Sequence, residues 1–238
     1  MKPYYQDNAV TIYHGDCLEV LGSLPSNSVD AVVTSPPYNL GSNHHTANKK
    51  TQAYDDEMPE TDYQAWQVDV LNECLRVCNG WMFYNHQHRI RDGVLIKPDR
   101  WIEKTSWIWR QEIIWNRGSP NMDPCRFYPF TERIYIGEKA GNLHKFVNTR
   151  KLTDDWHISP VGSGGIHTRQ YPEQVPQNCI ASVPTARVVF DPFGGSGTTA
   201  RAAKDLGRVA IISERDERYC EFAAKRMGQG VLALEGIA

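Results

Sequence analysis

The sequence predicts an α/β domain with a doubly wound, mostly parallel sheet. Short runs of Val, Ile and Ala alternate with longer segments whose apolar residues recur every three or four positions, as strands and helices do in such sheets. The 238 residues can bury one sizeable core, and 40% hydrophobic with 23% charged residues is typical of a packed globular protein. We therefore treat residues 1–238 as a single domain.

Strand and helix segments alternate in the first part of the chain. Residues 10–16 (VTIYHGD) predict a strand that leads into the helical CLEVLGSL, and residues 28–34 (SVDAVVT) predict the next strand. Residues 61–78 carry apolar side chains at steps of three and four, which indicates an amphipathic helix. Thr61 and Gln64 have the spacing of a capping box, so we expect this helix to begin there.

The same alternation continues after one interruption. Residues 80–85 (GWMFYN) predict a strand, and residues 111–116 and 133–139 predict a late strand pair, with a long connection if they form a hairpin. Residues 140–171 mix Gly, His, Asn, Lys, Arg and aromatic residues without a clear period. Residues 186–227 predict strand, glycine turn, helix, strand and helix in succession, as expected for parallel sheets.

The overall balance of charge and cysteine excludes several classes of protein. The net charge of −2 argues against histone-like binding of nucleic acid but permits a locally basic face. No apolar run approaches the length of a membrane span, and the N-terminus does not read as a secretion signal, so we expect a cytoplasmic protein with no membrane partner. The six cysteines form no CxxC pair, so we expect reduced, mostly buried thiols and no metal site.

The segment DAVVTSPPYNLGS, residues 30–42, joins a buried strand to a stiff turn. Proline cannot donate to a sheet, and each proline restricts the residue before it, so Ser35, Pro36, Pro37 and Tyr38 must form a rigid, non-helical lip at the strand end. Such a lip can hold a backbone carbonyl and an aromatic ring in fixed positions.

A glycine turn, DPFGGSG at residues 191–197, follows the strand that begins near residue 187. Glycines there let the backbone approach a ligand, and Glu214 at the end of the next strand is placed to accept hydrogen bonds from ribose hydroxyls. The turn lacks the Gly-Lys-Ser/Thr of a phosphate-binding loop and the GxGxxG of dinucleotide folds. Either a nucleoside site or simple tight packing of strand on helix would explain the glycines. We expect Thr198 to cap the following helix, with contact to the ligand as the alternative.

The two segments together resemble the S-adenosylmethionine-dependent DNA methyltransferases that methylate amino groups. DPFGGSGTT with a downstream Glu, in one chain with TSPPY, carries the resemblance, and EIIWNRGSP, DDWHISPVG and HTRQYPEQVPQNCI extend it through most of the chain. The serine of the lip is similar to the N4-cytosine branch, and the order of lip before glycine turn is similar to the permuted β group. The resemblance implies a Rossmann-like sheet of the class I methyltransferase type with a small inserted recognition region.

The resemblance also implies roles for the lip in catalysis. The Ser35 side chain and the Pro36 carbonyl would accept hydrogen bonds from the target amine, which frees its lone pair for the methyl group. Pro36 and Pro37 fix the direction of that carbonyl, and Tyr38 would stack on a base flipped out of the duplex. Adenine N6 remains an alternative target, since both bases offer an amino group. A non-catalytic DNA- or nucleoside-binding relative is a further alternative.

For the cofactor, the resemblance implies a site along the glycine turn and the neighbouring strand ends. Glu214 would hold the ribose, and Asp16 would contact the adenine edge, although Asp16 is equally suited to cap the helix that follows it. The residues implied at the methionine and ribose end are Asp191, Phe193, Gly194, Gly195, Gly197 and, as the alternative to capping, Thr198.

Double-stranded DNA is the implied partner. The basic stretches are HQHRIRDG with the lysines, arginines and tryptophans of residues 97–110, and KAGNLHKFVNTRK. We select residues 139–170 as the target-recognition insertion, with help from residues 42–57. The resemblance implies that His167, Tyr171 and Pro172 belong to a segment that closes over the cofactor. Whether a second copy forms a homodimer, and whether a cognate restriction enzyme accompanies this chain, is left open.

Overall fold

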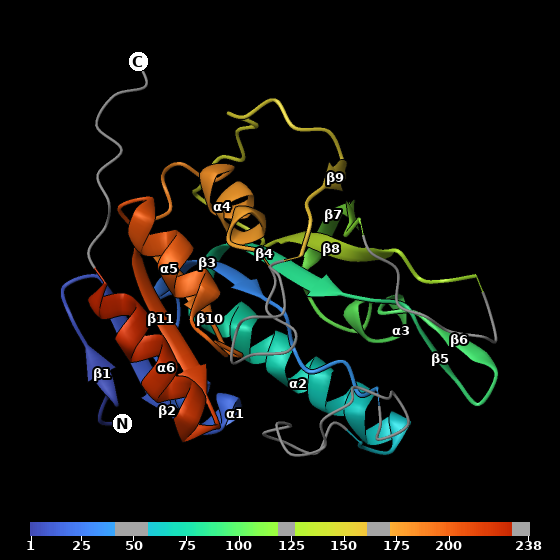
Figure 1. The fold of residues 1–238 in the computed structure, drawn as a ribbon, viewed down its shortest axis with the longest axis horizontal. Coiled ribbons are helices and arrows are strands. Elements are labelled where there is room, and N and C mark those ends of the chain that lie inside the picture. Colours follow the sequence, from blue (N-terminus) through green and yellow to red (C-terminus); the bar gives the residue numbers. More distant parts are fainter. Residues whose placement is uncertain (41–56, 119–126, 161–171, 230–238) are drawn as a thin grey trace.

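A computed structural model describes residues 1–40, 57–118, 127–160 and 172–229. Its centre is a nine-stranded sheet with helices on both faces, and a separate two-stranded hairpin projects from one end (Figure 1). The strands are β1 Tyr5–Gln6, β2 Val10–His14, β3 Val29–Thr34, β4 Cys78–His86, β5 Arg89–Arg91, β6 Val94–Ile96, β7 Ile108–Asn116, β8 Thr131–Glu138, β9 Asp155–His157, β10 Val188–Asp191 and β11 Val209–Glu214. The helices are α1 Cys17–Ser23, α2 Glu60–Val77, α3 Asp99–Ile102, α4 Gln174–Ala181, α5 Thr198–Asp205 and α6 Glu217–Gly228.

The strand order in the main sheet is β1-β2-β11-β10-β3-β4-β8-β7-β9. Strands β2, β11, β10, β3 and β4 are parallel neighbours, while β8 runs antiparallel between β4 and β7. The mostly parallel, doubly wound sheet expected from the alternation of segments is therefore confirmed. The late strand pair is also confirmed, because β7 and β8 pair antiparallel along their length.

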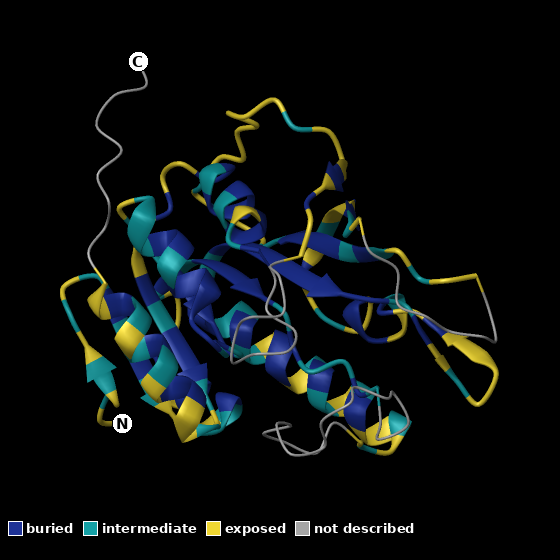
Figure 2. Ribbon diagram, in the orientation of Figure 1, coloured by how far each residue is buried: buried dark blue, intermediate teal, exposed yellow. Residues whose placement is uncertain are grey.

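Two apolar clusters cover the opposite faces of this sheet. Successive residues of β3 alternate between them: Ala31 and Val33 join one cluster and Val32 joins the other, because side chains alternate along a strand. Helices α4, α5 and α6 pack in the first cluster, and α1, α2 and α3 pack in the second. Figure 2 shows the resulting buried strands between partly exposed helices, with exposed positions gathered on the β5–β6 hairpin.

Helix α2 has its N-cap two residues earlier than the capping box predicted. Its N-cap is Pro59, whose carbonyl accepts from the backbone N–H of Tyr63, so Thr61 already lies inside the first turn. The Thr61 hydroxyl bonds to the Asp62 carboxylate, and the Gln64 amide donates to Glu60, so the predicted reciprocal cap is absent. The capping-box prediction was therefore wrong, whereas the amphipathic helix itself is confirmed.

The carboxyl ends of the parallel strands define one edge of the sheet, which we call the carboxyl edge. The chain enters residues 139–160 at the opposite edge: the Lys139 N–H donates to Gly80 O, and His144 bonds to Asn79 and Asp30 at the start of β4 and β3. It returns to the carboxyl edge along β9, which runs parallel to β7. The first and second halves of the expected recognition region therefore lie at opposite edges of the sheet.

Candidate active site

The lip and the glycine turn lie next to each other, although more than 150 residues separate them in the sequence. Strands β3 and β10 are parallel neighbours, so both segments leave the carboxyl edge side by side. The Thr34 hydroxyl, one residue before the lip, donates to the Asp191 carboxylate at 2.7 Å. Thr199 donates to the other oxygen of that carboxylate at 2.6 Å. Asp191 therefore ties the start of the lip to the start of α5.

Asp191 is buried, and its oxygens face these protein donors and the backbone N–H of Phe193. Burial raises the pKa of Asp191 from 3.8 to about 6, while the two threonines and the Phe193 N–H oppose the rise. The structure thus gives Asp191 a bracing role. Its contact with a cofactor stays a prediction.

The glycines of the turn are required by close packing at two positions. A Cβ on Gly194 would lie 2.7 Å from the Ile212 side chain, and Gly197 has φ +79° with Ala223 of α6 3.0 Å from where its Cβ would be. The packing explanation is therefore confirmed for this pair. Gly195 differs because it is partly accessible and its N–H donates to Glu214 at 2.8 Å.

Glu214 is the acidic group beside the turn, as the sequence predicted. It is partly accessible at the end of β11, and its two oxygens accept from the N–H groups of Gly195 and Asp216. Burial raises the pKa of Glu214, and these backbone donors oppose the rise. Because each carboxylate oxygen has a second lone pair, Glu214 can still accept from a ligand hydroxyl.

Asp16 follows β2, which neighbours β11 in the sheet. Its carboxylate accepts from the Leu18 N–H at 2.9 Å and caps α1, so the capping alternative is confirmed. The Gly15 N–H donates to the Glu214 carbonyl at 3.0 Å, which places Asp16 near Glu214. Contact of Asp16 with an adenine edge stays a prediction.

Thr198 does not cap α5, so that prediction was wrong. The N-cap is Gly197, whose left-handed conformation turns the chain into the helix without a side-chain cap. The buried Thr198 hydroxyl accepts from Arg226 of α6 at 3.2 Å.

Phe193 is partly accessible on the same turn, and the centroid of its ring lies 5.5 Å from that of Trp66 of α2 in an edge-to-face arrangement.

Around the lip, Ser35 and Tyr38 belong to a compact network of hydrogen bonds. The two hydroxyl oxygens lie 2.8 Å apart, and the Tyr38 hydroxyl donates to the Glu132 carboxylate at 2.9 Å. The amide nitrogen of Asn85 lies 2.9, 2.6 and 3.2 Å from the Glu132, Tyr38 and Ser35 oxygens, which share its two N–H donors. Arg117 lies 3.3 Å from the far oxygen of Glu132, so the buried carboxylate is paired.

The second proline of the lip is held from behind. The Tyr63 hydroxyl of α2 donates to the Pro37 carbonyl at 2.7 Å and also lies 2.7 Å from Nε2 of His86. Burial, with nearby Arg89, lowers the pKa of His86 from 6.5 to about 3, so this imidazole is neutral at physiological pH. The Tyr38 ring rests against His86 at 4.6 Å between centroids. The lip is therefore fixed at its serine, its tyrosine and its second proline.

Sequence reasoning missed Asn85, Glu132 and His86. Asn85 and His86 end β4, and β8 brings Glu132 beside them because it runs antiparallel to β4. The polar end of GWMFYNH was a signal for the first two, since polar side chains at the carboxyl end of a buried strand often belong to a site. No comparable signal marks Glu132, because its partners are distant in the sequence.

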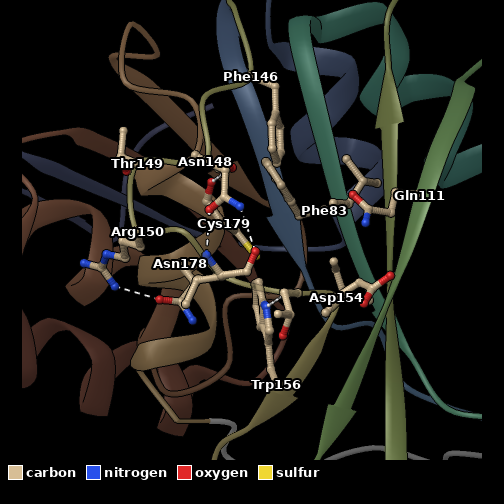
Figure 3. A pocket seen from close by; sticks show the side chains of 15 residues that line it. Phe83, Gln111, Phe146, Asn148, Thr149, Arg150, Asp154, Trp156, Asn178 and Cys179 are labelled. Carbon is tan, nitrogen blue, oxygen red and sulfur yellow. Dashed lines mark hydrogen bonds between the residues drawn. The ribbon is translucent and has the colours of Figure 1, made fainter.

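A small hollow of about 80 Å³ lies on the α4 side of the sheet (Figure 3). Phe83 and Ile136, which pair across β4 and β8, form part of its floor, two residues from the Asn85–Ile134 pair. Gln111 and Ile113 of β7, segment 146–156 and the end of α4 complete the lining, and Arg150 donates to Asn178 there at 2.7 Å. None of the predicted site residues lines it.

Within the basic stretches, several tryptophans and Arg89 belong to the core, whereas most lysines and arginines are exposed, namely Lys97, Arg100, Lys104, Arg110, Lys145, Arg150 and Lys151. Trp101 and Trp107 are core residues, Arg89 pairs with Glu60, and Arg110 pairs with Glu138. His167, Tyr171, Cys125 and residues 42–56 lie outside the described residues, whereas Pro172 is buried before α4. The five described cysteines are buried and free. Across the described ranges, we find no group of three potential metal ligands and no helix long and apolar enough to cross a membrane.

Comparison with known families places this arrangement in a defined class. The family model described as DNA methylase, which covers enzymes acting on N6 and N4 amino groups, matches residues 29–226. The match includes both the lip and the glycine turn. The chain belongs to this family of DNA amino-methyltransferases.

Individual relatives agree with this assignment. The type II methyltransferase M.ScaI of Streptomyces caespitosus is 28% identical over 264 positions, covering 95% of this chain and 84% of that protein. M.BglII of Bacillus subtilis is 28% identical, covering 89% and 67%. The solved PvuII cytosine-N4-specific DNA methyltransferase aligns with a TM-score of 0.79 at 21% identity, covering 98% of this chain and 91% of that one. A Thermus thermophilus DNA modification methylase complexed with S-adenosyl-L-methionine aligns with a TM-score of 0.67 at 23% identity, covering 94% and 96%. These structures confirm the fold.

Proposed function

We propose that this protein transfers a methyl group from S-adenosylmethionine to the N4 amine of a cytosine flipped out of double-stranded DNA. The observation that carries the proposal is the adjacency of the lip and the glycine turn, joined by the Thr34–Asp191 hydrogen bond of 2.7 Å. This adjacency supports a site for the amine at the lip beside a site for the methyl donor at the glycine turn, because the two segments leave neighbouring strands. Methyl transfer needs that proximity.

The residues of the turn fit this cofactor. Glu214 offers carboxylate lone pairs for ribose hydroxyls, Phe193 offers a partly accessible ring, and residues 192–200 contain no Lys or Arg to bind a phosphate. These groups suit a ligand that has a nucleoside but no phosphate. S-adenosylmethionine is such a ligand, and it supplies an electrophilic methyl group on a sulfonium sulfur. Glu214, Gly195 and Phe193 would hold it, with Asp16 at the adenine edge.

The lip residues would prepare the amine. The exocyclic nitrogen of cytosine is a weak nucleophile because its lone pair is delocalised into the ring. Ser35 Oγ and the Pro36 carbonyl, accepting its two N–H groups, would favour a pyramidal nitrogen with an available lone pair. The prolines and the Tyr63–Pro37 hydrogen bond fix this geometry before the base arrives. Direct displacement needs no covalent enzyme intermediate, in keeping with thiols whose pKa is raised by burial.

The choice of cytosine over adenine rests on the serine of the lip and on the fold shared with the cytosine-N4-specific PvuII enzyme. The test is to methylate DNA with the purified protein and to separate the digested nucleosides by mass spectrometry. We expect N4-methylcytosine. If N6-methyladenine is the main product, the target is the adenine N6 amine and the proposal of cytosine N4 is wrong.

The variant Ser35→Ala tests the role of the lip. We expect methyl incorporation to fall about 100-fold, as for the loss of one preorganised hydrogen-bonding group, while S-adenosylmethionine binding is retained. Unchanged activity would reject the role of Ser35. A wild-type protein that binds DNA and cofactor without methyl transfer would instead indicate the non-catalytic relative.

The carboxyl edge is the face proposed to meet DNA. The lip opens there, and the exposed Phe127 and Tyr128 precede β8 at the same edge. Within the expected recognition region, residues 139–150 are held at the opposite edge or over α4, so we propose target recognition for its second half, from residue 157 onward. The type II names of the relatives support a cognate restriction enzyme as a partner, whereas a homodimer and a cytoplasmic location are proposed from the sequence alone.

A further inference from the structure

We propose that Glu132 is a positioning residue that acts through the Tyr38 hydroxyl to aim a lone pair of Ser35 at the target amine. The inference deepens the proposed function and rests on it. It concerns the Ser35–Tyr38–Glu132 chain of hydrogen bonds and the Asn85 amide beside it.

The hydrogen bonds of this chain have a single consistent direction. A phenol has one proton, and Tyr38 donates it to the Glu132 carboxylate at 2.9 Å. Tyr38 can then only accept from Ser35, whose oxygen lies 2.8 Å away. The Ser35 proton is therefore committed toward Tyr38, and its oxygen is left to act as an acceptor. An acceptor is what the N–H of a target amine requires.

Glu132 also fixes the orientation of the Asn85 amide. A carboxylate repels a carbonyl oxygen and attracts an N–H, so the Asn85 nitrogen must face Glu132, at 2.9 Å. The same NH₂ group lies 2.6 Å from the Tyr38 oxygen and 3.2 Å from the Ser35 oxygen, so its second N–H is a protein donor toward these two hydroxyl oxygens. Among the described residues, the Asn85 carbonyl oxygen is buried without a hydrogen-bond partner, which is the expected cost of holding the amide this way round.

The negative charge of the Glu132 carboxylate fixes the direction of the Ser35–Tyr38–Glu132 hydrogen bonds, because a carboxylate can only accept. Burial, with the nearby Glu132 carboxylate, raises the pKa of Tyr38 well above its usual value of 10, so Tyr38 stays protonated and remains a donor. A neutral glutamine at position 132 could donate its own N–H to Tyr38. Tyr38 could then donate to Ser35, and the Ser35 proton would point at the incoming amine. The hydrogen bonds would then run in the opposite direction, and Ser35 would no longer offer an acceptor to the target amine.

The test uses Tyr38→Phe and Glu132→Gln, each in the wild-type background and combined with Ser35→Ala. Tyr38→Phe keeps the ring against His86 and any stacking on the base, and removes only the hydroxyl. The control is Glu138→Gln, at the other end of β8, where the carboxylate pairs with Arg110 away from the lip. The measurements are the single-turnover rate of methyl transfer to DNA, the Kd for S-adenosylmethionine and the Tm.

We expect Tyr38→Phe and Glu132→Gln each to slow methyl transfer about 10- to 100-fold, with little change in cofactor Kd. In the Ser35→Ala background, the same substitutions should slow transfer by less than about twofold, because residues acting through one group are not additive. The Glu138→Gln control should transfer methyl groups at the wild-type rate.

A wild-type rate for Tyr38→Phe would overturn the proposal, and so would losses that multiply fully with that of Ser35→Ala. Both results would leave the proposed function standing, because that function depends on the wild-type protein and on Ser35→Ala alone. A lack of methyl transfer by the wild-type protein would overturn both. If the Tm shows that Glu132→Gln does not fold, the proposal is decided by the double-mutant cycle of Tyr38→Phe with Ser35→Ala.

Discussion

Asp191 is the residue whose ionisation should be visible in the stability of the fold. Burial raises its pKa from 3.8 to about 6, so the folded protein binds a proton that the unfolded chain has already released in that range. This contribution is complete below pH 3.8 and is lost as the pH rises through about 6. Asp191→Asn removes the titration.

The measurement is urea unfolding of the wild-type protein and Asp191→Asn at a series of pH values. The free energy of unfolding of the wild-type protein, minus that of the variant, should fall by on the order of 2 to 3 kcal/mol between about pH 4 and pH 7. All other titrating groups are shared, so they cancel in the difference. A difference that stays constant or rises with pH would contradict the assignment.

The residues that the sequence placed in the site belong to motifs whose members are close together in the sequence. Ser35 and Pro36 stand in a motif of adjacent residues, and Glu214 follows the glycine turn by one strand, so spacing alone indicated them. Glu132 was missed because it touches Tyr38 only through the pairing of β4 with β8. Asp191 was found as part of a motif, but its hydrogen bond to Thr34 depends on β10 lying beside β3.

The turn into α5 is the element that should tolerate substitution least. In Gly197→Ala, the new Cβ would meet Ala223 of α6 at 3.0 Å, and the φ of +79° disfavours any L side chain. We expect a loss of about 1 to 3 kcal/mol in the free energy of unfolding. Denaturant unfolding measures this loss.

A matched control separates the turn from glycine replacement in general. Gly22 lies within α1 with nothing within 4 Å of where its Cβ would be, so Gly22→Ala should stabilise the protein by about 0.5 to 1 kcal/mol. It should leave methyl transfer unchanged. Equal effects of the two substitutions would show that packing against α6 does not constrain the turn.

At the level of elements, strands and helices could be predicted where their periodicity is long, but their ends could not. The apolar steps of residues 61–78 indicated α2 correctly, while Pro59 rather than Thr61 provides its cap. Likewise α5 was expected with a Thr198 cap and begins instead on Gly197. Each end is set by the backbone conformation of a single residue, which side-chain patterns do not reveal.

At the level of the whole molecule, the strand order decides which segments can act together. Three parallel neighbours, β11, β10 and β3, deliver Glu214, the glycine turn and the lip to one edge. The alternation of strands and helices predicted such a sheet, yet no pattern in residues 139–160 predicted that their first part is held at the opposite edge. There, His144 bonds to Asn79 at 3.0 Å and lies 3.2 Å from Asp30.

This arrangement predicts where DNA should protect the protein from hydrogen exchange. The backbone N–H groups of residues 127, 128, 130 and 157–159 lie toward the carboxyl edge and should exchange more slowly when a DNA duplex is added, because phosphate contacts give measurable affinity even without the target sequence. Amides of residues 139–145 should exchange at the same rate with and without DNA. Raising the salt concentration should remove the protection, since that affinity depends on released counterions. Protection confined to residues 139–145 would place DNA on the opposite edge, too far from the lip for a base to reach Ser35, and would separate DNA binding from the proposed chemistry.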